Sequence, residues 1–304
     1  MSLRQSHRFG LFCACAGALG FSFKAIFVKA AYRYGVDAET LLALRMGYAL
    51  PWFVAMAIAI ERREPRQMTW RDLGSLLLLG AVGYYAASYL DFLGLQHISA
   101  ALERLILFLY PTLVLILAAL FHRQAITQRM LLPLALCYVG ITLAVTHDAR
   151  LGGDNVMLGC VLVFLSALAY AVYLLLSGTA IHRFGATRLT AYATGAACVF
   201  SLAQFFSVRS PHNLVQPWQV HALSATMAVV STALPVWLVA ESIRILGAGQ
   251  AALIATLGPV FTILLAVLLL GEPLGLMQVL GAALVIGGVS LVARMKPMKP
   301  MKPK

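Results

Sequence analysis

The feature that most constrains this chain is a series of apolar stretches, each close to the length that a bilayer requires. Crossing a hydrocarbon core about 30 Å thick takes roughly 20 residues of α-helix. Of the 304 residues, 61% are hydrophobic and 11% are charged, against about a quarter charged in soluble domains. The ten stretches are Phe9–Tyr32, Thr40–Ile60, Leu73–Gly94, Ser99–Phe121, Met130–Thr146, Val156–Ile181, Leu189–Val208, Val220–Ile243, Ala248–Leu270 and Leu274–Ala293. We therefore expect an all-α, polytopic membrane protein with ten transmembrane helices in a lipid bilayer.

The distribution of basic residues predicts how the helices are oriented. Ten crossings put both termini on one side, and the termini with the connections 61–72, 122–129, 182–188 and 244–247 hold sixteen of the 23 Lys and Arg. The other five connections hold Arg33, Arg150 and Arg209 alone. Short cytoplasmic loops are the ones enriched in Lys and Arg, so we expect both termini to be cytoplasmic. The net charge of +12 then reflects orientation, and nucleic acid is not an expected partner.

The second half of the chain repeats the first. Ile98–Val145 aligns without gaps on Leu246–Ala293, at an offset of 148 residues. Thirteen of these 48 positions are identical, among them the pairs Pro111 with Pro259 and Gly140 with Gly288. We expect one five-helix repeat over residues 9–147 and a second over 156–294, followed by a disordered, basic, proline-rich cytoplasmic tail over 295–304.

Five crossings per repeat make the two repeats inverted, because the second copy enters the membrane from the opposite face. Inverted repeats are a design of secondary transporters, in which the solute site lies between the halves near the midplane and is exposed alternately to each side. A duplication retained only for stability is the alternative interpretation.

Charged side chains within the spans are the first candidates for a site, because each costs at least about 2.5 kcal/mol in hydrocarbon. Lys24, Arg45, Asp91, Glu103 and Arg104 all fall in the predicted outer half of spans one to four. Lys24 lies about 12 Å deep, and we expect it to face the solute path and to hold a carboxylate. We expect Glu103 or Arg104 to face the cavity edge, and the short turn after Asp91 to bring that residue level with Arg104. The alternative is a structural network in which these charges neutralise one another.

Two prolines and a set of aromatic residues are further candidates. Pro111 and Pro259 sit within spans at equivalent positions, and a proline there removes a backbone hydrogen bond, which predicts a hinge or a cavity; a harmless packing kink is the alternative. Tyrosines at mid-membrane depth need a hydroxyl partner, so aromatic residues could line a cavity for amphipathic solutes, with plain packing as the alternative. The candidates for solute contact are Tyr84, Tyr85, Phe108, Tyr170, Tyr173 and Trp237.

Glu241 and Arg244 lie on one face near the predicted inner end of span eight, since residues three apart are neighbours on a helix. This spacing is compatible with a gate and with a plain interfacial ion pair. No phosphate-binding loop of the P-loop type, Cys/His metal spacing or Gly-x-Ser-x-Gly motif is present in the sequence. We therefore expect no cofactor, no metal and no enzymatic activity.

The chain resembles the EamA-type members of the drug/metabolite transporter superfamily over nearly its whole length. The resemblance rests on the two repeats, on the Leu44-Arg45 pair and on the turn Leu270-Gly271-Glu272-Pro273. The first repeat departs from the pattern at its own turn, Phe121-His122-Arg123-Gln124. Membership implies ten helices with both ends inside, and exporters of amino acids or related metabolites are well represented in the family.

These observations together favour a secondary transporter of the bacterial inner membrane that functions as a monomer. It would export amino acids, aromatic or of broad range, or similar metabolites by alternating access, as a facilitator or driven by protons. A multidrug exporter of lipophilic cations is the second hypothesis, weakened because neither span one nor span six contains Asp or Glu. A membrane-embedded enzyme is the third, and it lacks a recognisable nucleophile or metal constellation.

Overall fold

The computed structural model describes residues 3–121, 128–150 and 155–293, and over these residues the chain is entirely helical. In the first half the elements are α1 (Leu3–Tyr32), α2 (Ala38–Arg63), α3 (Trp70–Gly80), η1 (Ala81–Ala86), α4 (Ala87–Gly94), α5 (Ala100–Leu107), α6 (Tyr110–Phe121) and α7 (Gln128–Arg150). In the second half they are α8 (Val156–Phe184), α9 (Ala186–Val208), η2 (Pro211–Leu214), α10 (Trp218–Ala228), η3 (Val229–Ala233), α11 (Leu234–Leu246), α12 (Ala248–Ala255), α13 (Gly258–Leu265), η4 (Ala266–Leu270) and α14 (Leu276–Ala293).

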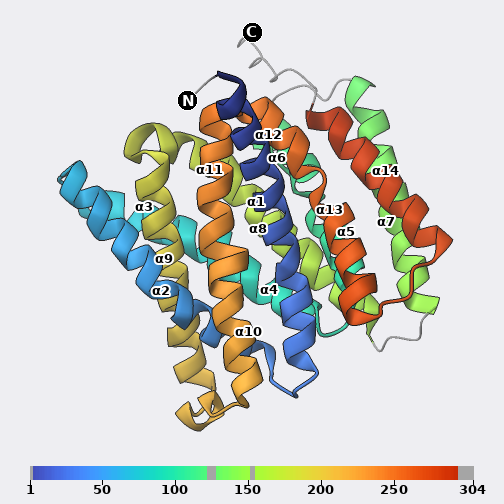
Figure 1. Cartoon of the computed structure of the whole chain (residues 1–304), viewed down its shortest axis with the longest axis horizontal. Coiled ribbons are helices and arrows are strands. Elements are labelled where there is room, and N and C mark those ends of the chain that lie inside the picture. The colour runs from blue at the N-terminus through green and yellow to red at the C-terminus, as the bar shows by residue number, and fades with distance from the viewer. Residues whose placement is uncertain (1–2, 122–127, 151–154, 294–304) are drawn as a thin grey trace.

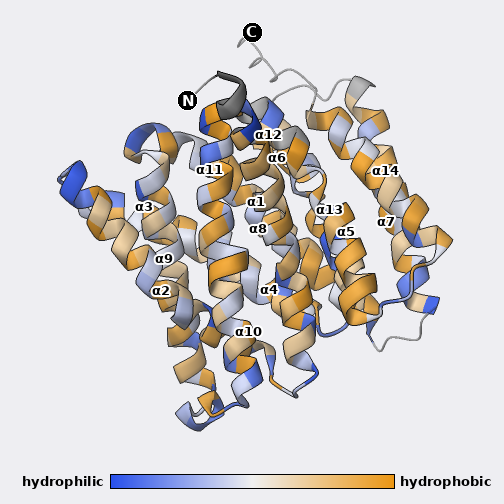
Figure 2. Ribbon diagram, viewed as in Figure 1, coloured by the Kyte–Doolittle hydropathy of each residue, from blue (hydrophilic) through white to orange (hydrophobic). Residues whose placement is uncertain are grey.

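The helices form one bundle, in which α1 begins and α14 ends at the same end (Figure 1). We call this end the terminal side and the opposite end the far side. Hydrophobic residues cover most of the helix length, and hydrophilic residues gather largely at the two ends (Figure 2). The predicted tail over 295–304 and the turn at His122-Arg123-Gln124 lie outside the described residues.

The structure confirms the all-helical membrane fold, although several of the predicted stretches are divided into shorter elements. Nine helices of the described residues are long and apolar enough to cross a membrane. The ninth predicted stretch, 248–270, is instead divided into α12, α13 and η4, and its apolar part Gly258–Leu270 counts as a shorter helix. The break between α12 and α13 falls just before Pro259, which has no N–H to donate and which crowds the preceding turn.

The two repeats are interrupted at equivalent places. The fourth span is divided between α5 and α6 directly before Pro111, as the ninth is divided before Pro259. At each break one leucine N–H turns back to the carbonyl three residues earlier: Leu109 to Ile106, and Leu257 to Ile254, both at 3.0 Å. The equivalence of these breaks follows the 148-residue offset of the sequence.

A second pair of irregularities follows the same offset. The π-helical segments η1 and η3 begin at Ala81 and Val229, 148 residues apart, within the third and eighth spans. Such segments are uncommon and are frequent at functional sites. In η1, Gly83 packs directly on the ring of Tyr173 of α8, so closely that a Cβ atom would overlap it. The third span can therefore approach the sixth only with glycine at this position.

Packing between the repeats is reciprocal, as inverted repeats require. Helix α1 packs on α11, and its counterpart α8 packs on η1 and α4 in the other half. The counterparts α2 and α9 pack on each other, as do α7 and α14. Gly140 on α7 and Gly288 on α14 each face a backbone carbonyl of the partner helix, which allows this peripheral pair to approach closely (Figure 1).

Ion pairs fasten α2 to α9 at both ends. On the terminal side, Nε of Arg188, at the start of α9, lies 2.7 Å from Oε1 of Glu61, near the end of α2. On the far side, Nη2 of Arg209 lies 3.3 Å from Oε2 of Glu39, in the first turn of α2. At both ends α2 supplies the acid and the α9 side supplies the arginine, so this antiparallel pair is held at each side of the bundle.

Candidate functional site

A cavity of about 380 Å³ lies between the two repeats and is lined by both of them. We call it the central cavity. Lys24 and Asp91 line the end of the cavity toward the far side. Ser242 of α11 and Ala251 of α12 line the end toward the terminal side, and each lies within four residues of the terminal-side end of its helix. Small-molecule sites typically enclose about 300–1,000 Å³, so the volume suits a small metabolite.

Lys24 bridges two carboxylates at the far end of this cavity. Its Nζ lies 2.6 Å from Oδ2 of Asp91 on α4 and 3.0 Å from Oε1 of Glu103 on α5. Asp91 is 2% exposed and Glu103 is fully buried, so each acid depends on this lysine for a countercharge. The sequence predicted Asp91 to lie level with Arg104. In the structure Asp91 and Glu103 both pair with Lys24 of α1 instead.

Arg45 of α2 enters the cavity wall from the side of the second span. Its Nη2 and Nε lie 3.1 and 3.4 Å from Oγ1 of Thr232, which the π-helical segment η3 presents. The guanidinium also lies over the ring of Phe92, 5.4 Å from its centroid. Only 7% of the residue is exposed, and Nη1 has no hydrogen-bond partner among the described residues.

Arg104 of α5 lies against the break in the ninth span. A Cβ atom built on Gly258, the first residue of α13, would come within 2.9 Å of Nη2 of Arg104. Among the described residues Arg104 has no ion pair, and its buried Nε has no hydrogen-bond partner. Glycine at position 258 therefore leaves the space that this guanidinium occupies.

Aromatic rings form one connected wall of the cavity. Rings of Tyr110 and Tyr170 lie edge to face with centroids 5.3 Å apart, Tyr170 stacks on Tyr173 at 5.9 Å, and Tyr173 contacts Tyr84 at 5.0 Å. Phe108 continues the chain through Tyr110 at 6.3 Å. Tyr173 supports the wall from behind Gly83, whereas the other four rings line the cavity itself.

The remaining predicted residues lie outside the cavity lining. Tyr85 is directed toward Tyr89 and Phe200, and Trp237 is 55% exposed on the surface of the bundle. Glu241 and Arg244 pair near the terminal-side end of α11, with Nε of Arg244 2.9 Å from Oε2 of Glu241, and the arginine is exposed.

The cavity wall also contains small hydroxyl residues that were not among the predicted site residues: Ser88, Ser166, Thr194, Ser231, Thr232 and Ser242. Hydropathy cannot find them, because serine and threonine are common in membrane helices. The 148-residue offset is a usable signal for two of them: Ser231 and Thr232 hold the positions equivalent to Gly83 and Tyr84, and all four line the cavity.

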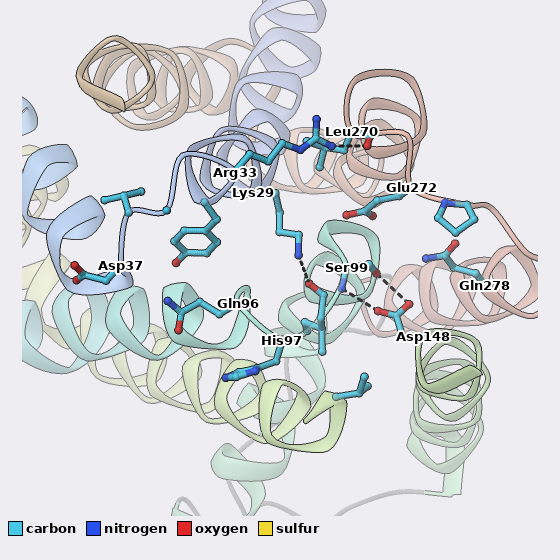
Figure 3. Close-up of a pocket in the computed structure, with 16 residues that line it drawn as sticks. Lys29, Arg33, Asp37, Gln96, His97, Ser99, Asp148, Leu270, Glu272 and Gln278 are labelled. Carbon is cyan, nitrogen blue, oxygen red and sulfur yellow. Dashed lines mark hydrogen bonds between the residues drawn. The ribbon is translucent and has the colours of Figure 1, made fainter. Parts of the chain in front are cut away.

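A second cavity, of about 900 Å³, opens on the far side. Figure 3 shows Lys29 reaching across it from α1, with Nζ 3.1 and 3.3 Å from the carbonyl oxygens of Ile98 and Leu95. Lys24 and Asp91 line the central cavity, and Lys29, five residues beyond Lys24 on α1, lines this one. The ion pairs of Lys24 therefore lie at the level where one cavity ends and the other begins.

Two carboxylates from different parts of the chain cap the first turn of α5 at this far-side cavity (Figure 3). Oδ2 and Oδ1 of Asp148 accept from the backbone N–H and the hydroxyl of Ser99, at 2.9 and 3.0 Å. Oε1 and Oε2 of Glu272 accept from the N–H groups of Ala100 and Ala101, at 2.8 and 3.3 Å. Acids are favourable at a helix N-terminus, where N–H groups lack helical partners.

Glu272 belongs to the turn between η4 and α14, so this capping joins the second repeat to α5 of the first. We call the contacts of this turn with α1, α5 and α7 the far-side latch. Nη2 of Arg33 donates to the carbonyl of Leu270 at 2.6 Å, and His147 lies 3.2 Å from the carbonyl of Pro273. Burial raises the pKa of the Glu272 carboxyl, opposed by the two N–H donors and by Lys29.

Among the described residues, no group of three His, Cys, Asp or Glu is arranged to hold a metal ion. What the central cavity offers is an apolar, ring-lined wall with cations, hydroxyl groups and one bridged pair of acids. Such a surface can bind and orient a small amphipathic solute.

Comparison with known proteins gives consistent matches along the chain. The profile of the EamA-like transporter family matches residues 8–146 and 157–294. The chain is 34% identical over 282 residues to the "uncharacterized transporter YcbK" of Bacillus subtilis, covering 91% of this chain and 88% of that one. It is 26% identical over 275 residues to a "probable terminal-alkyne amino-acid exporter" of Streptantibioticus cattleyicolor, covering 87% and 88%. A solved crystal structure covers 93% of this chain and 95% of its own, with a TM-score of 0.59 and 18% identity, which shows a shared fold.

Proposed function

Because the chain belongs to the EamA-like transporter family, we propose that it exports amino acids or closely related small metabolites through the central cavity. The observation that carries the proposal is the cavity itself, which is enclosed between two inverted repeats and has the volume of a small-molecule site. The amino-acid exporter of Streptantibioticus cattleyicolor, similar over 87% of this chain, supports this class of solute.

The proposed site consists of the residues that line the cavity together with those that support them. Lys24, Arg45, Asp91 and Arg104 supply charge, with Glu103 behind Lys24. Tyr84, Phe108 and Tyr170 supply apolar surface, with Tyr173 behind them. Trp237 and Tyr85 are not part of the proposed site, because neither lines the cavity.

We propose alternating access in which the far side is closed in this conformation. The ion pairs of Lys24 and the far-side latch both hold α5 at that end, whereas the terminal-side part of the lining consists of uncharged residues such as Val239, Ser242 and Ala251. Opening the far side would separate Glu272 from α5 and move α5 against α1. The breaks at Pro111 and Pro259 offer hinges for this movement.

Proton coupling is the form of energy supply that the geometry favours over facilitated diffusion. Two buried carboxyl groups, Asp91 and Glu103, share the single lysine Lys24. Because one cation faces two acids, we place the site of proton exchange at this cluster. Among the other charges of this region, Arg104 adjoins Glu103 on α5 and Arg45 faces the cavity from α2.

We further propose that the protein functions as a monomer in the bacterial inner membrane, with both termini in the cytoplasm. The Bacillus subtilis relative and the excess of basic residues in the connections on the terminal side support this placement. The far side would then face out of the cell.

The proposal is tested by flux measurements on purified protein in proteoliposomes, with labelled amino acids and a lipophilic cationic dye. We expect saturable flux of amino acids, accelerated by a pH gradient in wild type and insensitive to the gradient in Glu103→Gln. Saturable flux of the dye alone would favour the multidrug alternative. Absence of flux for every solute would contradict the proposed function.

A further inference from the structure

We propose that Arg45 and Arg104 form an anion-binding subsite in the central cavity, which takes the carboxylate of the solute. This inference rests on the proposed function and narrows it. It also assigns to two arginines the role that the sequence analysis gave to Lys24.

The ion pairs of the cavity wall, within the described residues, do not include these two arginines. Three cations line the cavity, and the two acids of the cluster, Asp91 and Glu103, are both bound to Lys24. Within the described part of the chain no salt bridge reaches Arg45 or Arg104. A solute with a negative group would therefore supply the countercharge that the wall lacks, whereas Lys24 has no need of one.

Among the residues that the structure describes, Arg45 keeps one buried donor without a partner at the cavity wall. Thr232 occupies Nη2 and Nε, and the ring of Phe92 covers one face of the guanidinium. The remaining Nη1 is buried without a partner, in a residue that is 93% buried and lines the cavity. A buried, unpaired donor is costly, and an anion in the cavity removes that cost.

Arg104 lines the same cavity from α5, where it lies against the start of α13 in the second repeat. Its Nε is also buried without a partner, and its Nη2 lies in the space that Gly258 leaves free. Helix α13 begins at Gly258, so the positive end of its dipole adds to the charge of the guanidinium. Half-helices that begin within the membrane serve anionic groups in this way in other transporters.

The remaining wall selects a carboxylate with an apolar part. The planar guanidinium matches the two oxygens of a carboxylate or the oxygens of a phosphate. Tyr84, Phe108, Tyr110 and Tyr170 cover the adjoining wall with rings, and the cavity of about 380 Å³ is small. We therefore expect free amino acids with apolar or aromatic side chains to bind, and their carboxamides to bind weakly.

The experiment is isothermal titration of the purified full chain with alanine, leucine and phenylalanine, each beside its carboxamide, and with phenyl phosphate. We expect wild type to bind at least one acid about 10-fold or more tightly than its amide. Arg45→Gln and Arg104→Gln should each weaken that acid by about 10- to 150-fold, the range of a charge-assisted hydrogen bond, and leave the amide unchanged. Arg150→Gln, an exposed arginine at the end of α7, is the matched control and should change neither.

Equal affinity for acid and amide in wild type, or absence of acid binding altogether, would overturn the subsite. Equal loss of both ligands in the variants would also overturn it, by showing a structural role. If Arg104→Gln fails to fold, Arg104→Lys keeps the charge without the planar fork and should still weaken the acid alone. Tighter binding of phenyl phosphate than of any acid would overturn the assignment to a carboxylate.

Failure of the subsite and failure of the proposed function are distinguishable. Acid binding that depends on the arginines, without flux of any acid in proteoliposomes, would leave the subsite intact and contradict the transport of amino acids. Saturable flux of acids and amides alike, unchanged in both arginine variants, would contradict the subsite and leave the proposed transport of amino acids intact.

Discussion

The two repeats share their architecture and differ in their charges. Breaks before equivalent prolines, π-helical segments 148 residues apart and reciprocal packing give both halves the same frame. Yet every charged residue of the central cavity belongs to the first repeat: Lys24, Arg45, Asp91 and Arg104. At the positions equivalent to Asp91 and Glu103 the second repeat has Val239 and Ala251, which line the cavity near the terminal side.

The difference separates what shapes the cavity from what gives it chemistry. Because the repeats are inverted, charges confined to the first one lie toward the far side, and their uncharged counterparts lie toward the terminal side. In the proposed mechanism, the shared frame supplies the volume, the hinges and the ability to alternate. The unshared residues supply the proposed solute recognition and the closure of one side, so substitutions at equivalent positions should have unequal effects.

The largest effect is expected from Lys24→Met. Removing one partner of a buried ion pair costs about 3–5 kcal/mol, and here two buried acids lose their countercharge. The free energy of unfolding of the purified protein, from denaturant titration in detergent, should fall by this amount. Adding Asp91→Asn and Glu103→Gln to Lys24→Met should restore most of the loss; an unchanged stability in the single variant would contradict the pairing.

Val239→Asp should be the next most damaging, because it places an acid at the position equivalent to Asp91 without a lysine beside it. A carboxylate at this depth costs roughly 2.5–3.5 kcal/mol on insertion scales. The yield of folded, monodisperse protein in membranes measures the effect, with Val239→Ala as the matched control. Normal yield of the aspartate variant would show that the second repeat could carry charge, and that the asymmetry is not a physical requirement.

Gly83→Ala should destabilise by about 1–3 kcal/mol, the usual range for overpacking, because the added Cβ meets the ring of Tyr173. Gly178→Ala, on the same helix as Tyr173, is the control, since nothing lies within 4 Å of its added atom. The equivalent position in the second repeat, Ser231, already carries a Cβ. Thermal unfolding of the two alanine variants compares them directly, and equal midpoints would argue against the close approach of the third and sixth spans.

Glu272→Ala should cost about 1 kcal/mol, the usual value of a helix cap, because two N–H groups of α5 lose their acceptor. Glu272→Gln should cost less, since burial already raises the pKa of this carboxyl and so disfavours its charge. Chemical denaturation of both variants tests the order. A glutamine variant weaker than the alanine variant would show that the latch does not act through these hydrogen bonds.

Pro111→Ala and Pro259→Ala should have the smallest effect on stability, less than about 1 kcal/mol each, because both helices are already divided at these places. Both should slow flux to a similar extent if the hinges are equivalent. Flux through the two variants in proteoliposomes measures this equivalence. Loss of flux in only one of them would make the hinge a property of one repeat.

Much of the frame could be predicted from the sequence. The length of each apolar stretch, the placement of Lys and Arg and the 148-residue offset predict the spans, and two inverted repeats follow from the odd number in each. The proline of the ninth stretch accounts for its division into α12 and α13. These features depend on the length and backbone chemistry of single helices, which a sequence displays directly.

The site was less predictable, because it depends on how each helix is rotated. In a membrane bundle both faces of a helix are apolar, so hydropathy does not distinguish Tyr84, which lines the cavity, from Trp237, which is exposed. Asp91 pairs with Lys24 because of where α1 lies in the bundle. The spacing along the chain between Asp91 and Arg104 carries no information about the position of α1. The π-helical segments have no sequence signature beyond the repeat itself.

The measurement that tests the central claim most directly is amino-acid flux through proteoliposomes containing wild type, Arg104→Gln or the exposed-residue control Arg150→Gln. If the charges of the first repeat give the shared cavity its chemistry, wild type and the control should show the same saturable flux, and Arg104→Gln should lose at least about nine tenths of it at low solute concentration, as a tenfold change in affinity requires. Equal flux in all three proteins would contradict the account.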